Sequence, residues 1–402
     1  MWREDSVRMN KNFETDCVIV GGGPAGMMTA LLLLRNGVKV TVVEKHADFL
    51  RDFRGDTIHP STQDLLEELG LLNEFLVRPH SDMERVTLSW HSTELVLADF
   101  SHLPTRRKTM TFMPQWDFLD LLADACSRHP GFRLLRSTRI DALSSEEGRI
   151  VGVTGTAPDG DVSIRGRLVI DASGRDSVVR AQAGLTPVGV AAAMDVLWFR
   201  LSKRPDEHYP FVQAGAGMII TIDRDDFFQI AHVIPAGSWN GSKDDITQMK
   251  QRIALIAPRM QEAVVAIAAA DVQVLNVRLE RLRQWSVDGL LCIGDAAHAM
   301  SPAGGVGINL AIQDAVATAR ILGPVLRSGR PSRADLRRVQ RRRSWPARIT
   351  QMVQRLLQEP LLSTHAPGTP LPLPLRLLRD HPASARLTGR FVGLGARPEH
   401  IH

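Results

Sequence analysis

Cys17-Val-Ile-Val-Gly-Gly-Gly-Pro-Ala-Gly26, close to the start of the chain, is the stretch that decides the fold. It opens with a continuous apolar run, which is typical of a strand buried inside a parallel sheet. A glycine turn follows, and residues 27–35 then have the composition of a helix that ends at Asn36-Gly37. A second apolar run over residues 38–43 closes with Glu44. The order strand, glycine turn, helix, strand predicts the first βαβ unit of a dinucleotide-binding domain.

The spacing of the glycines gives each of them a separate function in such a unit. Gly21 allows the tight turn, Gly23 lets the backbone approach a pyrophosphate, and Gly26 lets the helix pack closely on the strand. Glu44 follows about 20 residues later, where an acid hydrogen-bonds the ribose hydroxyls of the bound dinucleotide. Because a carboxylate would repel a 2′-phosphate, these residues favour FAD or NAD over NADP as the resident dinucleotide.

Residues 295–309, far along the chain, form a second glycine-rich stretch. The apolar run over residues 289–294 should deliver Asp295 to the edge of the sheet. Gly304-Gly-Val-Gly307 then leads into a helix pattern over residues 310–319. A helix N-terminus behind a glycine loop is an anion-binding site. Taken alone, this stretch could equally be a flexible turn, and the N-terminal motif is what favours a closing half of the same site.

Composition and charge limit the classes of protein to which the chain can belong. With 402 residues, 44% of them hydrophobic and 23% charged, it should form two or three ordinary globular domains. The net charge of +5 is only mildly basic, and arginines concentrate late, around residues 337–343. We interpret that run as a solvated helix face, and we expect no nucleic-acid partner.

The three cysteines, Cys17, Cys126 and Cys292, show neither disulfide nor metal-ligand spacing. Their odd number indicates a reducing, cytoplasmic compartment and no metal site. The first 16 residues are polar and mixed in charge, which does not fit a signal peptide. The apolar run over residues 27–34 is too short to span a bilayer.

Asp171-Ala-Ser-Gly-Arg-Asp-Ser-Val-Val-Arg180 follows a third apolar run and forms another strand-to-loop-to-helix junction. With the two stretches above, it makes the chain resemble the single-component (group A) flavoprotein aromatic hydroxylases, the p-hydroxybenzoate-hydroxylase-like FAD monooxygenases. Residues 21–26 with Glu44 are similar to that family's ADP-binding fingerprint. Residues 294–309 look like the motif that holds the ribityl chain, the pyrophosphate and the flavin edge.

Two departures from the family pattern weaken individual assignments. The middle motif usually carries an Asp-Gly pair, and Ser173 stands here at the position of the acid. The chain contains a single tyrosine, Tyr209, so it cannot form the pair of tyrosines that relays protons in some members of the family.

The resemblance and the strand patterns together predict an α/β plus α+β protein. A Rossmann-like FAD-binding domain should carry an inserted substrate domain with an antiparallel sheet and be followed by a helical C-terminus. The expected parts are a leader over residues 1–14, the FAD-binding domain over residues 15–80, 111–185 and 281–325, the substrate-binding domain over residues 81–110 and 186–280, and the C-terminal helical region over residues 326–402.

The resemblance also implies which residues hold FAD. Asp295 should bond the ribityl hydroxyls, and residues 304–309 should line the isoalloxazine. Arg54 should lie along the cofactor, and Gln115 should lie near the ribityl chain. The complete expected set is Gly21, Gly23, Pro24, Ala25, Gly26, Glu44, Lys45, Arg54, Gln115, Asp295, Pro302, Gly304, Gly305, Val306, Gly307, Ile308 and Asn309.

The reaction that the resemblance implies uses NADPH or NADH transiently to reduce FAD. The reduced flavin takes up O2 as a C4a-hydroperoxide, which hydroxylates an electron-rich aromatic, enolic or quinone-like small molecule. The expected protein is a monomer or homodimer, and its arginine-rich late helix allows peripheral contact with a membrane. The alternatives are a reductase or dehydrogenase without oxygen insertion, a flavin-dependent halogenase, and a FAD-binding protein that acts by contact with a partner. The halogenase is disfavoured because its Trp-x-Trp-x-Ile-Pro element is absent.

Candidates for the reaction itself are few. His59 is a candidate base near the loop that should contact FAD, and a surface histidine next to a helix N-cap explains it as well. His298, close to Asp295, fits a structural role better than a catalytic one. Candidates for the walls of the substrate pocket are Trp90, Trp198, Phe228 and His232, each of which core packing would also explain.

Overall fold

The computed structural model describes residues 11–50, 56–91, 93–224, 226–362 and 369–401. Arg54 lies outside these residues. The prediction of a leader over residues 1–14 is wrong for residues 11–14, which form strand β1 (Lys11–Glu14). This strand pairs in parallel with β12 (Gly160–Arg165), and Phe13 lies opposite Ile164. Among the described residues, no helix is both long and apolar enough to cross a membrane.

A six-stranded, mainly parallel sheet confirms the α/β prediction. In its strand order, β19-β20-β13-β2-β3-β9, all pairs are parallel except β19 with β20. Its strands are β2 (Cys17–Val20), β3 (Val40–Val43), β9 (Phe132–Leu135), β13 (Leu168–Asp171), β19 (Ser286–Val287) and β20 (Leu290–Cys292). The N-terminal glycine turn therefore leaves a central strand, at the carboxyl edge where ligands of such sheets bind.

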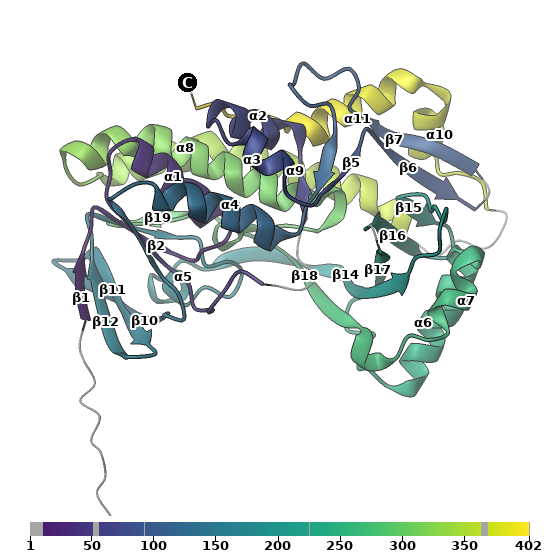
Figure 1. Cartoon of the computed structure of the whole chain (residues 1–402), viewed down its shortest axis with the longest axis horizontal. Coiled ribbons are helices and arrows are strands. Elements are labelled where there is room, and N and C mark those ends of the chain that lie inside the picture. The colour runs from purple at the N-terminus through teal and green to yellow at the C-terminus, as the bar shows by residue number, and fades with distance from the viewer. Residues whose placement is uncertain (1–10, 51–55, 92, 225, 363–368, 402) are drawn as a thin grey trace, which may run out of the picture.

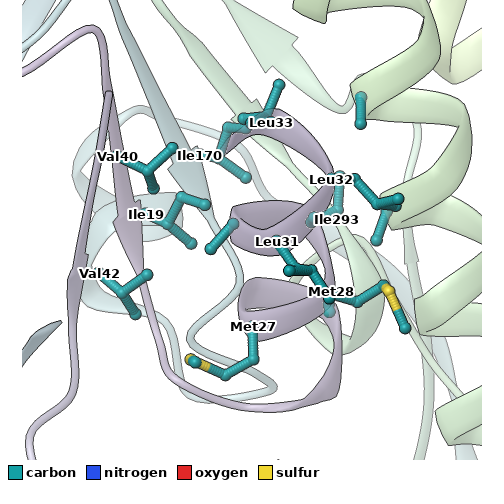
Figure 2. Packing of buried hydrophobic residues seen from close by; sticks show 14 of the residues in the cluster. Ile19, Met27, Met28, Leu31, Leu32, Leu33, Val40, Val42, Ile170 and Ile293 are labelled. Atoms are coloured by element: carbon teal, nitrogen blue, oxygen red, sulfur yellow. The ribbon is translucent and has the colours of Figure 1, made fainter. Parts of the chain in front are cut away.

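Helix α1 (Pro24–Arg35) is buried on all sides between this sheet and helix α8 (Val306–Ser328). Figure 2 shows Met27, Leu31 and Leu33 of α1 packed around Ile19 and Ile170 of the sheet. All residues from Ala25 to Leu34 are buried, which explains why the helix has no polar face. Helix α4 (Gln115–Ser127) packs beside α1.

An eight-stranded sheet forms the second large layer and confirms the predicted antiparallel sheet. Its order is β21-β18-β14-β17-β16-β15-β6-β7, in which only β15 and β6 run in parallel. The strands are β6 (Arg85–Trp90), β7 (Thr93–Asp99), β14 (Pro187–Ser202), β15 (Val212–Ala214), β16 (Met218–Asp223), β17 (Phe227–Pro235), β18 (Gln273–Leu282) and β21 (His298–Ala299).

The two faces of this sheet contribute to different cores. On one face, side chains such as Leu88, Trp198 and Ala231 form a cluster that we call the inner-face cluster. On the other face, Leu197 and Ile230 pack against helix α6 (Lys243–Ile256) and helix α7 (Gln261–Val264). In Figure 1, α6 and α7 lie together at the lower right, apart from α1 and α8.

Two small sheets and a set of short helices complete the two layers. A three-stranded sheet, β4-β8-β5, and a four-stranded sheet, β1-β12-β11-β10, join the larger ones. Their remaining strands are β4 (Thr57–Ile58), β5 (Ser81–Met83), β8 (Met110–Phe112), β10 (Arg139–Glu146) and β11 (Arg149–Ala157). The short helices are α2 (Pro60–Glu68), α3 (Leu72–Leu76), α5 (Val178–Gln182), η1 (Pro258–Met260), η2 (Ala269–Asp271), η3 (Gly294–Ala296) and η4 (Ala303–Gly305).

The C-terminal region is helical, as predicted. Its helices are α9 (Arg333–Leu362), α10 (Leu373–Asp380) and α11 (Pro382–Leu394). Helices α10 and α11 are separate, because His381-Pro382 interrupts the helical stretch. Helix α11 packs on β7 and α2, so the end of the chain returns to both layers.

Candidate functional site

The three sequence motifs meet at the carboxyl edge of the parallel sheet. A Cβ atom on Gly21 would lie 2.4 Å from the carbonyl oxygen of Ala172, which places the first motif against the middle one. A Cβ atom on Gly294 would lie 3.0 Å from the Cβ of Ala25 and 3.4 Å from that of Ala311. The third motif is thereby placed on the first turn of α1. Stretches more than a hundred residues apart form one site.

The N-terminal turn fits an anionic group that approaches the backbone. Gly21 has φ +106°, a conformation that side-chain-bearing residues rarely adopt. A Cβ on Gly26 would lie 2.0 Å from the carbonyl oxygen of Gly21, so helix and turn are in close contact. At Gly23, in contrast, a Cβ would meet no atom within 4 Å. The space beside Gly23, at the N-terminus of α1 with Pro24 in the first turn, is therefore open to a phosphate.

Glu44 lies at the end of β3, where the sequence predicted a ribose-binding acid. Its carboxylate accepts hydrogen bonds from the backbone N–H groups of Gly22, at 2.9 Å, and His46, at 3.0 Å. These bonds fix the acid beside the glycine turn, although it is nearly buried. Lys45 is exposed next to it.

The middle motif is organised by a buried aspartate. Asp171 accepts hydrogen bonds from the hydroxyl groups of Ser173 and Ser177, both at 2.6 Å. Ser177 also caps helix α5 by accepting a bond from the N–H of Arg180, at 2.9 Å. Ser173, the departure from the family pattern, therefore fixes the shape of this loop.

The loop from Pro302 into α8 closes the other side of the site. Gly305 has φ +62°, and a Cβ there would lie 2.1 Å from Oγ1 of Thr57. The side chain of Asn309 accepts hydrogen bonds from His59 N–H, at 2.9 Å, and from Thr62 Oγ1, at 2.7 Å. It also donates to the carbonyl oxygens of Thr57 and Gly305, each at 3.2 Å. Asn309 thus holds this loop against strand β4.

The remaining residues of the predicted FAD set differ in how exposed they are. Gly304 is exposed, and Val306 and Gly307 are partly exposed in the first turn of α8, whereas Ile308 is buried. Gln115 begins helix α4 and is partly exposed. The side chain of Asp295 is 43% exposed, and its Oδ2 lies 3.7 Å from Nε of Arg175. The carboxylate of Asp295 is therefore partly exposed next to Gly294, which lies beside the first turn of α1.

Behind the site, a fully buried ionic network fixes the third motif. Asp314 of α8 lies 2.5 Å from Nε2 of His298 and accepts bonds from the N–H of Gly294, at 3.1 Å, and from Nε of Arg343, at 3.0 Å. Burial alone would raise the pKa of Asp314, but His298 and Arg343 lower it. His298 is buried in this network, in agreement with the structural role that we predicted.

His59 is the N-cap residue of α2 and lies under the C-terminal helix α11. Its Nδ1 is 2.7 Å from the carbonyl oxygen of Val392, and it borders a cavity of about 30 Å³ between α2, α8, α9 and α11. Burial lowers the pKa of His59 to about 4, against partial compensation by the carbonyls of Val392 and Gly304. The side chain is therefore neutral at neutral pH.

The four predicted pocket residues do not share one face of the sheet. Trp90 and Trp198 belong to the inner-face cluster. Phe228 lies in the opposite core with α6, and His232 alternates with inner-face residues on the same strand. Burial and the nearby Arg252 of α6 lower the pKa of His232 to about 3. The expectation that all four line one pocket is therefore wrong, because the alternation of strand β17 turns two of them away.

Sequence reasoning missed one polar group beside the site. Asp56, immediately before β4, forms an ion pair with Arg224, which follows β16, and Arg224 also bonds Gln229 of β17. Neither Asp56 nor Arg224 belongs to a sequence motif, and no local pattern predicts that two residues 168 positions apart will pair.

A family model for the FAD binding domain matches residues 14–355. The chain is 34% identical over 356 residues to the 6-methylpretetramide 4-monooxygenase of Streptomyces rimosus, which covers 87% of this chain and 85% of that protein. It is 27% identical to a rifampicin monooxygenase of Streptomyces venezuelae over 75% of this chain and 62% of that one.

Solved structures show the same fold. The p-nitrophenol 4-monooxygenase of Pseudomonas putida superposes with a TM-score of 0.78 at 18% identity, over 96% of this chain and all of that one. The anhydrotetracycline hydroxylase OxyS of Streptomyces rimosus superposes with a TM-score of 0.77 at 22% identity. The superposition covers 95% of this chain and 76% of that one.

The fold and the assembled motifs define a flavoprotein oxidoreductase. The chain belongs to the FAD-binding-domain family of group A flavoprotein monooxygenases. It is an FAD-dependent monooxygenase that uses NAD(P)H and O2 and acts on aromatic compounds, and the reductase alternative is not supported.

Proposed function

We propose that this enzyme hydroxylates a polycyclic phenolic substrate rather than a single-ring phenol. The similarity over 87% of the chain to a 6-methylpretetramide 4-monooxygenase carries the proposal. The more distant 12-dehydrotetracycline 5-monooxygenase/anhydrotetracycline 6-monooxygenase of the same species, at 27% identity, supports it. The three free cysteines, all buried, fit the reducing cytoplasm that we propose as its compartment.

The predicted FAD set is part of the proposal. The open space beside Gly23 and the N-terminus of α1 would hold the pyrophosphate, and Glu44 would hold the ribose. Asp295 would bond the ribityl hydroxyls, and residues 304–308 would line the isoalloxazine. FAD, when bound, accepts hydride from NAD(P)H and activates O2, while the protein orients the reactants and excludes water.

The inner face of the eight-stranded sheet is the proposed substrate wall. Strand β4 touches Gly305 through Thr57 and pairs with β8, whose Phe112 lies in the inner-face cluster. Phe112 also packs on Phe211 at 5.5 Å between ring centroids. A substrate between this face and the loop over residues 302–309 would lie next to the flavin edge. The substrate-binding and FAD-binding domains that we predicted from the sequence are part of this proposal.

The experiment that tests the proposal measures NADH and NADPH oxidation by the purified yellow protein under ¹⁸O2. The panel contains 6-methylpretetramide, anhydrotetracycline, 4-nitrophenol and 2,4-dichlorophenol, with catalase present. We expect faster cofactor oxidation and one ¹⁸O atom in the product with the polycyclic compounds. Label in the products of only the single-ring phenols would overturn the proposed substrate class.

Peripheral contact with a membrane is a second proposal, and it concerns the outer face of helix α9. Arg341, Trp345, Arg348, Met352 and Arg355 are exposed there at helical spacing, and Trp345 is 52% exposed. Aromatic and cationic side chains on one face suit an anionic lipid surface. Vesicle flotation at low salt tests this contact, and protein that stays with the aqueous fraction would contradict the proposed membrane contact.

The oligomeric state is also a proposal, and gel filtration would distinguish a monomer from a homodimer.

A further inference from the structure

Asp56, Arg224 and Gln229 form a connected polar group, which we call the Arg224 cluster. Asp56 and Arg224 form an ion pair whose side chains are only 10% and 13% exposed. Gln229 Oε1 accepts hydrogen bonds from Nε of Arg224, at 3.2 Å, and from its Nη2, at 2.9 Å. One edge of the guanidinium is therefore fixed by two partners, and Nη1 has no hydrogen bond to any of the described residues.

The cluster lies where the flavin-lining loop meets the sheet. Asp56 directly precedes Thr57, which is in contact with Gly305. The backbone carbonyl oxygen of Asp56 accepts a hydrogen bond from Met113 N–H at 2.8 Å. Gln229 alternates with Phe228 and Ile230, which belong to the opposite core, so its side chain lies on the inner face.

Arg200 of β14 lies opposite Gln229 in the register of β14 with β17. Burial lowers the pKa of Arg224, and the positive charge of Arg200 lowers it further. The outer end of the cluster is closed by Asp223, which pairs with Lys203 at 2.6 Å and lies near His208. The guanidinium of Arg224 is therefore the charged group of the cluster that donates hydrogen bonds on the inner face.

Three groups that could handle the proton of a phenol, Tyr209, His232 and His59, lie away from the cluster. Tyr209 packs on Phe228 with ring centroids 4.9 Å apart and bonds Glu207, beside the opposite core. His232 is turned to the same side, and His59 lies under α11. An aromatic ring becomes more electron-rich when its hydroxyl is ionised, so a group that stabilises that anion has a direct use in this reaction.

We propose that Arg224, held by Asp56 and Gln229, binds the ionised hydroxyl oxygen of the substrate through Nη1 and thereby orients the ring toward the flavin. The inference rests on the proposed function only for the position of the substrate on the inner face. The hydroxyl proton leaves to solvent, and Arg224 remains a cation throughout.

The two charged members of the cluster should shift the ionisation of a bound phenol in opposite directions. The guanidinium stabilises the phenolate and lowers the phenol's pKa, whereas the carboxylate of Asp56 opposes that effect. Burial raises the pKa of Asp56 to about 6, against Arg224, which lowers it, so the carboxylate is charged above that pH. A role limited to holding two strands together would not produce this opposition.

The test is a pH titration of 4-nitrophenol bound to the oxidised, FAD-loaded protein, because its ionised form absorbs in the visible. We expect the wild-type protein to lower the apparent pKa of the bound probe by about one unit, a tenfold change in its ionisation constant. Arg224→Met should abolish the shift, Arg224→Lys should keep part of it, and Asp56→Asn should enlarge it.

Two further variants protect the test against simple misfolding. Arg224→Met with Asp56→Asn removes both charges, leaves no unpaired buried ion, and should also abolish the shift. Arg149→Met with Asp288→Asn removes a partly buried ion pair at the start of β11, away from the inner face, and should leave the probe unaffected.

The outcomes separate this inference from the proposed function. A wild-type protein that leaves the probe's pKa unchanged, or does not bind the probe up to millimolar concentration, would overturn the role of Arg224 even if a polycyclic substrate is hydroxylated. The same holds if Arg224→Met retains the wild-type shift. A shift that depends on Arg224, without oxygen insertion into any polycyclic compound, would support the role of Arg224 and overturn the proposed substrate class.

Discussion

Single glycines of the N-terminal turn differ in what surrounds them, and this difference separates folding from cofactor binding. Gly26→Ala places a Cβ 2.0 Å from a backbone oxygen that cannot move aside, and it should lower the free energy of unfolding of the apoprotein by about 1–3 kcal/mol. The Cβ added by Gly23→Ala meets no protein atom, so the free energy of unfolding of the apoprotein should change by less than about 0.5 kcal/mol.

The affinity for FAD should show the reverse order. A methyl group on Gly23 would enter the space that we assign to the pyrophosphate, and we expect the Kd of FAD to rise about tenfold or more. Urea unfolding of the apoprotein and quenching of flavin fluorescence measure the two effects. Equal FAD affinity in wild-type protein and Gly23→Ala would show that the pyrophosphate lies elsewhere.

His59 should make the stability of the protein depend on pH. Its pKa in the folded protein is about 4, below the ordinary value of 6.5, so protonation favours the unfolded chain. The stability is fully present above pH 6.5 and is lost as the pH falls toward 4, by on the order of 3 kcal/mol.

The measurement compares urea unfolding of the wild-type protein and His59→Asn at pH 7, 5.5 and 4. The variant has no group that titrates at this position, so the wild-type protein should lose stability relative to it as the pH falls. A difference between the two proteins that stays constant over this range would contradict the buried, neutral histidine.

At the scale of single elements, helix α6 stabilises the fold but contributes no residue to the candidate FAD site. Ser242 and Asp245 form a capping box at its N-terminus, in which the Ser242 hydroxyl accepts a bond from Asp245 N–H at 3.1 Å. Ser242→Ala should lower the free energy of unfolding by about 1 kcal/mol. The rate of substrate hydroxylation and the Kd of FAD should not change, because α6 covers the face turned away from the flavin. A fall in turnover larger than twofold in the folded variant would place α6 near the reaction.

Helix α1 shows how burial overrides amphipathic patterning. Its run of leucines and methionines resembles a membrane segment more than a surface helix, yet it is enclosed by the sheet and by α8. The glycine turn before it and Asn36-Gly37 after it fix its length, which is why the sequence predicted its position closely.

At the scale of the whole molecule, Glu399, close to the end of the chain, connects the two long helices α8 and α9 through ion pairs. Glu399 is buried and forms ion pairs with Arg320 of α8, at 2.9 Å, and Arg342 of α9, at 2.7 Å. Its backbone N–H donates to Gln313 at 2.5 Å. Glu399→Gln removes a fully buried carboxylate from the partly exposed Arg320 and Arg342, and it should lower the free energy of unfolding by about 1–3 kcal/mol.

Glu68→Gln is the matched control, because Glu68 also contacts the tail, through His400 and Ile401, but is more exposed. It should change the stability by less than about 1 kcal/mol. Thermal unfolding with and without FAD measures both variants. Similar losses in the two variants would show that the tail is held by its backbone rather than by the buried carboxylate.

The sequence by itself determined the local units of this protein. Gly21, Gly23 and Gly26 predicted the turn and the direction of α1, and the run before Asp295 predicted the strand that leads to the second half of the site. These signals are local, because a tight turn, a buried strand and a helix N-terminus depend on residues that are neighbours in the chain.

Only the tertiary structure decided which surfaces meet. The alternation of β17 implies that Phe228 and His232 share a face, but which face lies opposite the flavin loop depends on how β14, β17 and β18 pair over long separations. The ion pair between Asp56 and Arg224 has the same origin. Such contacts depend on the packing of distant segments, and no local spacing encodes them.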